Sequence, residues 1–190
     1  MQQIFLNYRA FIVLALLCLL LAVTPDSWHL ALRYSRSGVE QSEYWRLVTG
    51  HLLHSNNWHL LMNLGGLLLA ALLHGRYFRS AVLLSQWLFA ALLISVALYF
   101  GSAQIHAYVG LSGLLHAMLM LGAVKDIQLK QRGGYLLFAG LLLKVVYEQW
   151  QGPDSDLATL IAANVAIDAH LYGVVSGMLL ALILRLLRKL

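Results

Sequence analysis

The chain has 190 residues, of which 61% are hydrophobic and only 11% are charged, with a formal net charge of +5. Soluble domains are about half apolar and about a quarter charged, so this composition excludes an ordinary soluble globular domain. The basic residues stand singly between apolar runs, which argues against nucleic-acid binding and indicates membrane topology instead.

Six apolar segments follow one another along the chain, each bounded by charged or turn-forming residues. A helix needs about 20 apolar residues to cross a bilayer, so six spans would use roughly 120 residues and leave no room for a separate soluble domain. The sequence therefore predicts one all-α membrane domain over residues 1–190, a bundle of six transmembrane helices. The predicted spans are residues 10–23, 58–74, 81–100, 109–124, 135–147 and 159–184.

Three of these segments differ in length or spacing from ordinary separate spans. The first is short and follows Arg9, which leaves a cleaved signal peptide as the alternative to a retained span, although no small-x-small cleavage motif stands out. The third and fourth lie within residues 80–124, an uncharged stretch that is too long for one helix and has a hinge at Gly101-Ser102. We expect a helical hairpin there.

Basic residues gather in alternate loops, as expected when short cytoplasmic loops hold the excess of Lys and Arg. Three of the 13 fall on one side of the six-span arrangement and Lys144 falls inside the fifth span. The other nine share the opposite side, so both termini are predicted to be cytoplasmic. Those nine are Arg9, Arg76, Arg79, Lys125, Lys130, Arg132, Arg185, Arg188 and Lys189. The loop of residues 24–57 is then external, and its mixture of aromatic and charged residues suits the membrane interface.

Four polar residues fall at one depth, near the external ends of their predicted helices: His59, Asn63, Ser112 and His170. Polar side chains at membrane depth are costly and often mark function. His59 and Asn63 are four residues apart, so they share a helix face and can direct donors at one point. The lipid bilayer is therefore an expected partner. A functional site is expected inside the membrane, near its external side.

Ser112 lies between Gly110 and Gly113, small residues that allow a close backbone approach and a direct turn from loop into helix. The first amides of a helix are unpaired, so a nucleophile at this position has a donor beside it. His170 precedes Gly173 and Gly177 on one stripe, with spacing typical of close helix packing.

If that stripe meets Gly113, the His170 imidazole can take the Ser112 proton as a general base. Asp168 lies two residues before His170, roughly 200° around the helix, and is poorly placed to orient it. The spacing therefore predicts a Ser-His dyad.

Each feature also has an ordinary structural explanation. Small-x-x-small spacing usually indicates helix packing, a histidine at the outer end of a span is usually interfacial, and one asparagine usually makes an interhelical hydrogen bond. The prediction of a site depends on the four residues meeting at one depth.

Four motifs follow one another along the chain: Glu43-Tyr44-Trp45-Arg46, His59 with Asn63, Gly110-Leu111-Ser112-Gly113, and Ala169-His170-Leu171-Tyr172-Gly173 with Gly177. Together they resemble the motifs of the rhomboid intramembrane serine proteases. The resemblance covers the predicted six-helix core and implies that Ser112 is the nucleophile and His170 the base. It also implies an oxyanion hole made of His59, Asn63 and the Ser112 amide, and it implies no cofactor.

Within that family, the short chain and the sequences Gly-Leu-Ser-Gly-Leu-Leu-His and Asp-Ala-His-Leu-Tyr-Gly are most similar to the rhombosortase branch. That branch is associated in Gram-negative bacteria with exported proteins that carry a C-terminal GlyGly-CTERM tail: a glycine-rich motif, an apolar helix and a basic end. The resemblance implies membrane-anchored substrates with such a transmembrane tail, cut near the glycines on the periplasmic side of the inner membrane. The resemblance does not distinguish hydrolysis of the acyl-enzyme by water from transfer of the acyl group to an amine.

One position departs from the family pattern. Many rhomboids have a tyrosine four residues after the nucleophile that stacks on the catalytic histidine, whereas this chain has His116. His116 lies one turn from Ser112, so it can pack against His170, but the usual stacking is in doubt. The roles of Lys144 and Asp168, as a buried pair or with other partners, stay open as well.

Three other classes of protein compete with this interpretation, of which a small transporter is disfavoured because the chain shows no inverted repeat with paired broken helices. A zinc intramembrane protease would use the cluster of His51, His54 and His59, but its His-Glu-x-x-His ligand motif is missing, so no metal site is expected. A non-catalytic rhomboid-like protein that binds transmembrane helices is the main alternative function. Such a protein is expected to lack the serine or the histidine, and this chain has both.

Overall fold

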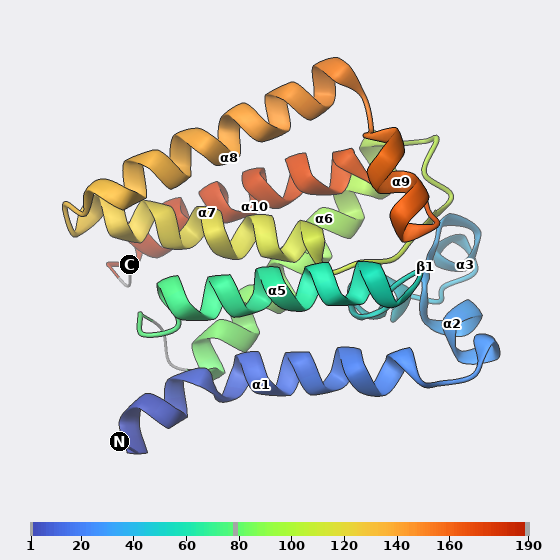
Figure 1. Ribbon diagram of the computed structural model, residues 1–190, viewed down its shortest axis with the longest axis horizontal. Helices are drawn as coiled ribbons and strands as arrows, with labels where there is room; N and C mark the ends of the chain where they lie inside the picture. Colours follow the sequence, from blue (N-terminus) through green and yellow to red (C-terminus); the bar gives the residue numbers. More distant parts are fainter. Residues whose placement is uncertain (1, 78–79, 189–190) are drawn as a thin grey trace.

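A computed structural model describes residues 2–77 and 80–188, in which long helices lie side by side as a bundle (Figure 1). The beginning of α1 and the end of α10 lie at the same end of this bundle. Two residues that the topology prediction used, Arg79 and Lys189, lie outside the described residues. The long helices are α1 (Gln2–Ala22), α5 (Asn57–His74), α6 (Ser80–Gly101), α7 (Ser112–Gln128), α8 (Arg132–Gln151) and α10 (Ile167–Leu186).

The predicted sixth segment, residues 159–184, is wrong in its first part. The chain there forms a short helix, α9 (Ser155–Ile161), and α10 begins only at Ile167. Ala162 ends α9 in the left-handed conformation, with φ of 51°, and the amides of Ala162 and Ala163 bond back to carbonyls of α9. His170 therefore lies in the first turn of α10 rather than in the interior of a helix that begins at residue 159.

The fourth segment also begins later than predicted, at Ser112 rather than at residue 109. The chain before it contains β2 (Ala107–Tyr108), which pairs antiparallel with β1 (Tyr34–Ser35). The predicted hinge at Gly101-Ser102 coincides with the end of α6. Residues 102–111 thus form a connection that fixes where α7 starts.

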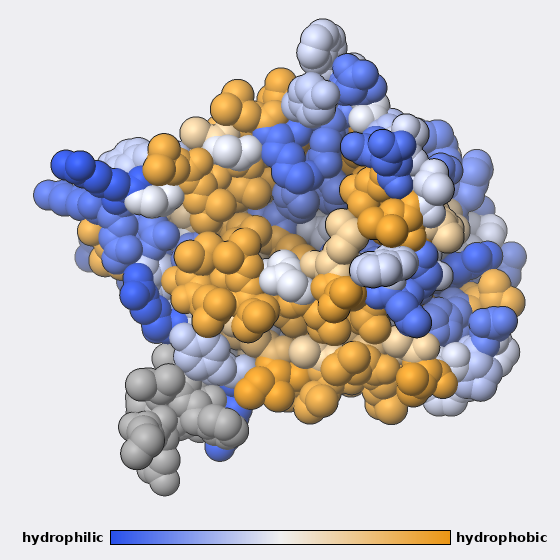
Figure 2. Space-filling model, in the orientation of Figure 1, coloured by the Kyte–Doolittle hydropathy of each residue, from blue (hydrophilic) through white to orange (hydrophobic). Residues whose placement is uncertain are grey.

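Two described helices, α6 and α10, are long and apolar enough to cross a membrane, and the stretch Tyr8–Ala22 of α1 is a shorter apolar helix. Figure 2 shows a broad hydrophobic belt across the middle of the bundle, with hydrophilic residues gathered toward its two ends. This distribution is typical of a protein embedded in a bilayer with its helices across it.

The loop between α1 and α5 is folded rather than irregular. It contains α2 (Asp26–Leu32), β1, α3 (Arg36–Glu40), α4 (Arg46–Thr49) and the 3₁₀ turn η1 (Gly50–Leu52). Buried Arg46 organises it: the guanidinium donates to Glu43 at 2.5 Å and to the carbonyls of Leu30 and Arg33 at 2.7 and 2.8 Å. These bonds hold the loop over the end of the bundle at which α5, α7 and α10 begin.

The backbones of α7 and α10 approach closely because glycines face each other. A Cβ atom on Gly177 would lie 2.5 Å from the Ala117 carbonyl oxygen, and one on Gly173 would overlap the carbonyl of Gly113. Gly113 in turn lies against the Ala169 carbonyl. This contact brings the first turns of the two helices together.

His51 fastens the loop to α6. The imidazole is fully buried, and its Nε2 lies 3.1 Å from the Ala91 carbonyl and 3.0 Å from Ser95 Oγ, while the Ser95 hydroxyl donates to Leu47 at 2.7 Å. Nε2 therefore carries the proton that Ala91 accepts. Burial lowers the pKa of His51 to about 4.

We expect His51→Ala to lower the free energy of unfolding by about 1–3 kcal/mol at pH 7.5, because it removes this buried hydrogen bonding. A histidine in the unfolded chain has a pKa of about 6.5, so between that pH and about 4 the unfolded chain binds a proton that folded His51 does not. The wild type should therefore lose stability as the pH falls through this window, and the variant should lose less.

Thermal unfolding in detergent across pH 4.5–7.5 measures both effects. His106→Ala is the matched control, because His106 is exposed in the described structure. An equal pH dependence in wild type and His51→Ala would contradict the assignment.

Candidate active site

The four polar residues that the sequence placed at one depth line a single cavity of about 880 Å³. α5 contributes His59 and Asn63, α7 contributes Ser112, and α10 contributes His170. Residues of α8 and α9 complete the walls. The cavity therefore joins elements that are far apart in the sequence.

Ser112 and His170 are in direct contact. Ser112 is the first residue of α7, and its Oγ lies 2.9 Å from Nε2 of His170. The glycine contact between α7 and α10 allows this distance, because both side chains begin from helix turns whose backbones touch. A neutral imidazole with its lone pair on Nε2 can accept the serine proton in this geometry.

His116 stacks on His170. The two ring centroids are 4.4 Å apart with an angle of 18° between the planes, and His116 Nδ1 lies 2.7 Å from the Ser112 carbonyl oxygen. A carbonyl only accepts, so Nδ1 of His116 carries a proton. A histidine thus makes the stacking contact that the sequence left in doubt.

The other side of Ser112 is lined by donors. Gly110 has φ of +131°, which favours glycine, and a Cβ there would lie 2.8 Å from His59 Nε2. Asn63 Nδ2 is buried and has no hydrogen-bond partner among the described residues. The Ser112 amide adds a third donor, because the first amides of a helix have no partner within it.

The tautomer of His59 depends on Ser55. The Ser55 backbone N–H donates to Nδ1 of His59 at 3.4 Å, and Ser55 Oγ lies 3.0 Å from the same nitrogen. The Ser55 hydroxyl itself donates to the Ile161 carbonyl at 2.6 Å. In the tautomer that accepts this amide bond, Nε2 carries the proton and faces Gly110. This form of His59 can donate to an oxyanion beside Ser112.

The loop before Ser112 is held by its own hydrogen bonds. The Tyr108 hydroxyl donates to the Gly110 carbonyl at 2.5 Å, and the Gly110 amide donates to Gly50 at 3.1 Å. Burial raises the pKa of Tyr108, so this phenol stays protonated and remains a donor. These bonds fix the direction from which the chain enters α7.

A model of the rhomboid domain matches residues 41–187, which includes every residue just described. This chain belongs to the rhomboid family. Rhomboids are typically serine intramembrane proteases that act on transmembrane proteins, and this chain is a membrane protein with apolar helices.

Two relatives support the assignment to the rhomboid family, although their sequence identity to this chain is low. The rhomboid protease GlpG of Haemophilus influenzae is 25% identical over 189 residues, covering 94% of this chain and 92% of that protein. The candidate rhomboid protease YdcA of Bacillus subtilis is 26% identical over 148 residues, covering 76% of this chain and 69% of its own.

Glu148 contacts His170 in this rhomboid, although the sequence did not predict it as a site residue. Both carboxylate oxygens lie near His170 Nδ1, at 3.0 and 3.1 Å, and Lys144 donates to Oε1 at 2.5 Å. Glu148 is 22 residues from His170 and lies on another helix, so no spacing along the chain predicts that the two side chains meet. The four-residue spacing of Lys144 and Glu148 indicates only that these two side chains can pair on one helix face.

Asp168 faces away from the rhomboid's cavity, as its helical angle predicted. Its carboxylate accepts from Ser102 at 2.6 Å, from Gln104 at 2.9 Å and from Gln149 at 3.3 Å. Asp168 therefore connects α10 to the end of α6 and to α8, and it is not the partner of Lys144.

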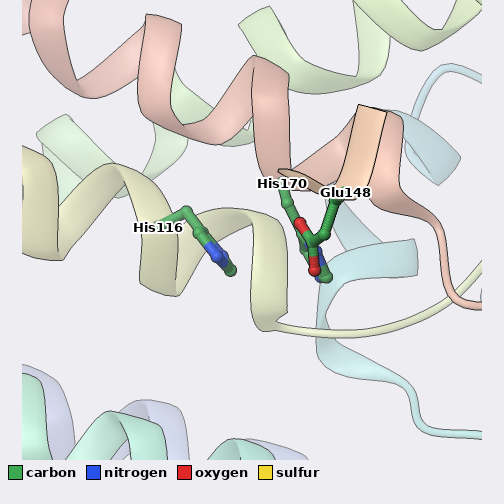
Figure 3. A group of neighbouring side chains, drawn as sticks. All are labelled: His116, Glu148 and His170. Atoms are coloured by element: carbon green, nitrogen blue, oxygen red, sulfur yellow. The ribbon is translucent and has the colours of Figure 1, made fainter. Parts of the chain in front are cut away.

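Three side chains form a group that could also hold a cation: His116, Glu148 and His170, whose ligand atoms lie within 4.8 Å of one another. Figure 3 shows them reaching toward a common space from three helices. His51 and His54 belong to no such group in the described part of the chain. The sequence-based zinc alternative, with His51, His54 and His59, therefore names other histidines than this group contains.

Proposed function

We propose that this rhomboid is a serine endopeptidase that cuts membrane-anchored proteins, with Ser112 as nucleophile and His170 as general base. The observation that carries the proposal is the 2.9 Å contact between Ser112 Oγ and His170 Nε2 at the wall of an open cavity. Serine alone is a weak nucleophile, and an adjacent base is the usual means of activating it.

In the first half of the reaction, His170 takes the Ser112 proton as Oγ attacks the peptide carbonyl. The negative charge that develops on the carbonyl oxygen falls beside the Ser112 amide, Asn63 Nδ2 and His59 Nε2. His170 then gives its proton to the leaving amine, and the C–N bond breaks. In the second half, His170 takes a proton from water, the hydroxide attacks the acyl-enzyme, and Ser112 recovers its proton.

The proposed substrates are C-terminal transmembrane tails with a glycine-rich segment of the GlyGly-CTERM type, as the rhombosortase resemblance implies. The cavity wall suits a partly apolar chain, since Met62 of α5 and Leu115 and Leu141 of α7 and α8 line it together with the polar site. Glycine costs about 1 kcal/mol relative to alanine in a helix, so a Gly-Gly segment unwinds easily to present a peptide bond.

The topology proposed with this function has six transmembrane spans, both termini in the cytoplasm, and the cavity open to the periplasm from the bacterial inner membrane. Its support is the arrangement of the bundle, in which the beginning of α1 and the end of α10 lie opposite the Ser112 end. The alternative is a rhomboid that binds transmembrane helices without cutting them. The paired Ser112 and His170 favour the enzyme.

The test uses the purified protein in liposomes with a reporter fused to a transmembrane tail that begins with Gly-Gly. We expect wild type to release the soluble reporter and Ser112→Ala to release none. A second reporter, with Leu-Leu in place of Gly-Gly, tests the tail preference and should be cut more slowly. Equal cleavage of both reporters would refute the tail specificity, and no cleavage of either by folded wild type would support the binding alternative.

We expect Asn63→Ala to lower kcat by about 10²–10³-fold with little change in KM, because one oxyanion donor is lost only when charge develops. Steady-state cleavage of the Gly-Gly reporter measures both constants. Asn57→Ala on the same helix is the matched control, because Asn57 is exposed at the start of α5. A rise in KM at constant kcat would assign Asn63 to substrate binding instead.

A further inference from the structure

The histidine that faces Ser112 has a carboxylate on its other nitrogen. Glu148 Oε1 and Oε2 lie 3.1 and 3.0 Å from His170 Nδ1, on the opposite edge of the ring from Ser112. Both side chains are mostly covered, with 8% of His170 and 17% of Glu148 exposed. From this geometry we propose that Glu148 is the positioning residue of His170 and completes a Ser-His-Glu triad, an inference that rests on the proposed function.

The tautomer of His170 follows from the partners of its two nitrogens. An ionised carboxylate only accepts hydrogen bonds, so its contact with Nδ1 requires a proton on Nδ1. A neutral imidazole then has its lone pair on Nε2, which faces Ser112 Oγ. Glu148 therefore selects the tautomer that can act as a base. It also holds the ring in the orientation in which Nε2 contacts Ser112.

Glu148 also faces the charge that appears during the reaction. When Nε2 accepts the serine proton, His170 becomes an imidazolium, and the adjacent carboxylate stabilises it without taking a proton itself. The proton on Nδ1 stays on Nδ1, and the serine proton passes from Nε2 to the leaving amine. Atoms and charges thus balance with no additional donor.

Glu148 also contacts Lys144, which lies on the same helix. Its ammonium lies 2.5 Å from Oε1, one helical turn away on α8, and the Lys144 side chain is 45% exposed. The other titratable rings near His170 are His116, which stacks on it, and His59 across the cavity. Among the described residues, Glu148 is the acidic side chain that bonds to His170.

The experiment compares wild type, Glu148→Gln and Lys144→Met in detergent with EDTA present, so that a metal at His116, Glu148 and His170 cannot carry the result. The readouts are the rate of covalent labelling by a fluorophosphonate, and kcat and KM for the Gly-Gly reporter. We expect Glu148→Gln to lower the labelling rate and kcat by about 10²–10⁴-fold with KM nearly unchanged, because glutamine no longer fixes the tautomer. Lys144→Met should stay within about threefold of wild type, since the Lys144 side chain is 45% exposed and an ion pair open to solvent on one side contributes little.

A purely structural Glu148–Lys144 pair would give equal losses in both variants, and that result would overturn the inference. Wild-type labelling with an unchanged rate in Glu148→Gln would overturn it too, while leaving the proposed function intact. Wild type that is folded but unlabelled would overturn both.

Nuclear magnetic resonance of the histidine rings in Ser112→Ala decides the matter even if Glu148→Gln does not fold. The His170 signals are identified by their loss in a second sample that also carries His170→Ala. We expect a proton on Nδ1 with a resonance far downfield of an ordinary imidazole N–H, as a strong bond to a carboxylate produces. A proton on Nε2 instead would overturn the inference.

Discussion

Ser112→Ala is expected to lower kcat by about 10⁴–10⁶-fold, and His170→Ala by a similar factor, because the nucleophile and its base act as one unit. The double variant should be no slower than either single variant. This non-additivity follows from the direct contact of the two side chains, since each is of little use for attack without the other.

Steady-state cleavage of the Gly-Gly reporter by the two single variants and the double variant measures the effect. Ser176→Ala serves as the control serine, because its hydroxyl donates within α10 to the Tyr172 carbonyl and lies outside the cavity lining. Independent losses that add in the double variant would mean that the two residues do not share a step.

Gly173→Ala should lower both the free energy of unfolding and kcat. The new Cβ would overlap the Gly113 carbonyl, which is backbone and cannot rotate away, so α7 and α10 must move apart. Overpacking of this kind costs typically about 1–3 kcal/mol of unfolding free energy. A displacement of about 1 Å between Ser112 and His170 would lower kcat by a further ~10²-fold.

Gly140→Ala is the matched control, because nothing lies within 4 Å of a Cβ at this exposed position of α8. It should leave kcat unchanged and raise stability slightly, since alanine is favoured over glycine in a helix by about 1 kcal/mol. Thermal unfolding and the reporter assay, run on both variants, give the comparison. Wild-type values for Gly173→Ala would show that the close contact of α7 and α10 is not needed.

The sequence could predict the parts of the site that depend on local rules. Ser112 opens its helix as its glycine neighbours suggested, and His59 and Asn63 share a face because they are four residues apart. Asp168 faces away from the site for the same helical reason. These positions follow from the geometry of one helix at a time.

The rest depends on contacts between distant segments. Glu148 meets His170 only because α8 packs beside α10, and no spacing along the chain reports that packing. The sequence does not predict the break between α9 and α10, because the residue in the left-handed conformation there is Ala162 and not a glycine. The small sheet of Tyr34–Ser35 and Ala107–Tyr108 joins two loops more than 70 residues apart.

The most direct test of the central claim is covalent labelling of the purified protein with a fluorophosphonate, followed by peptide mapping of the adduct. If Ser112 is the activated nucleophile, we expect one adduct, on the peptide that contains Ser112. We also expect this adduct to be absent in both Ser112→Ala and His170→Ala. An adduct on another serine, or labelling that persists in His170→Ala at the wild-type rate, would contradict the account.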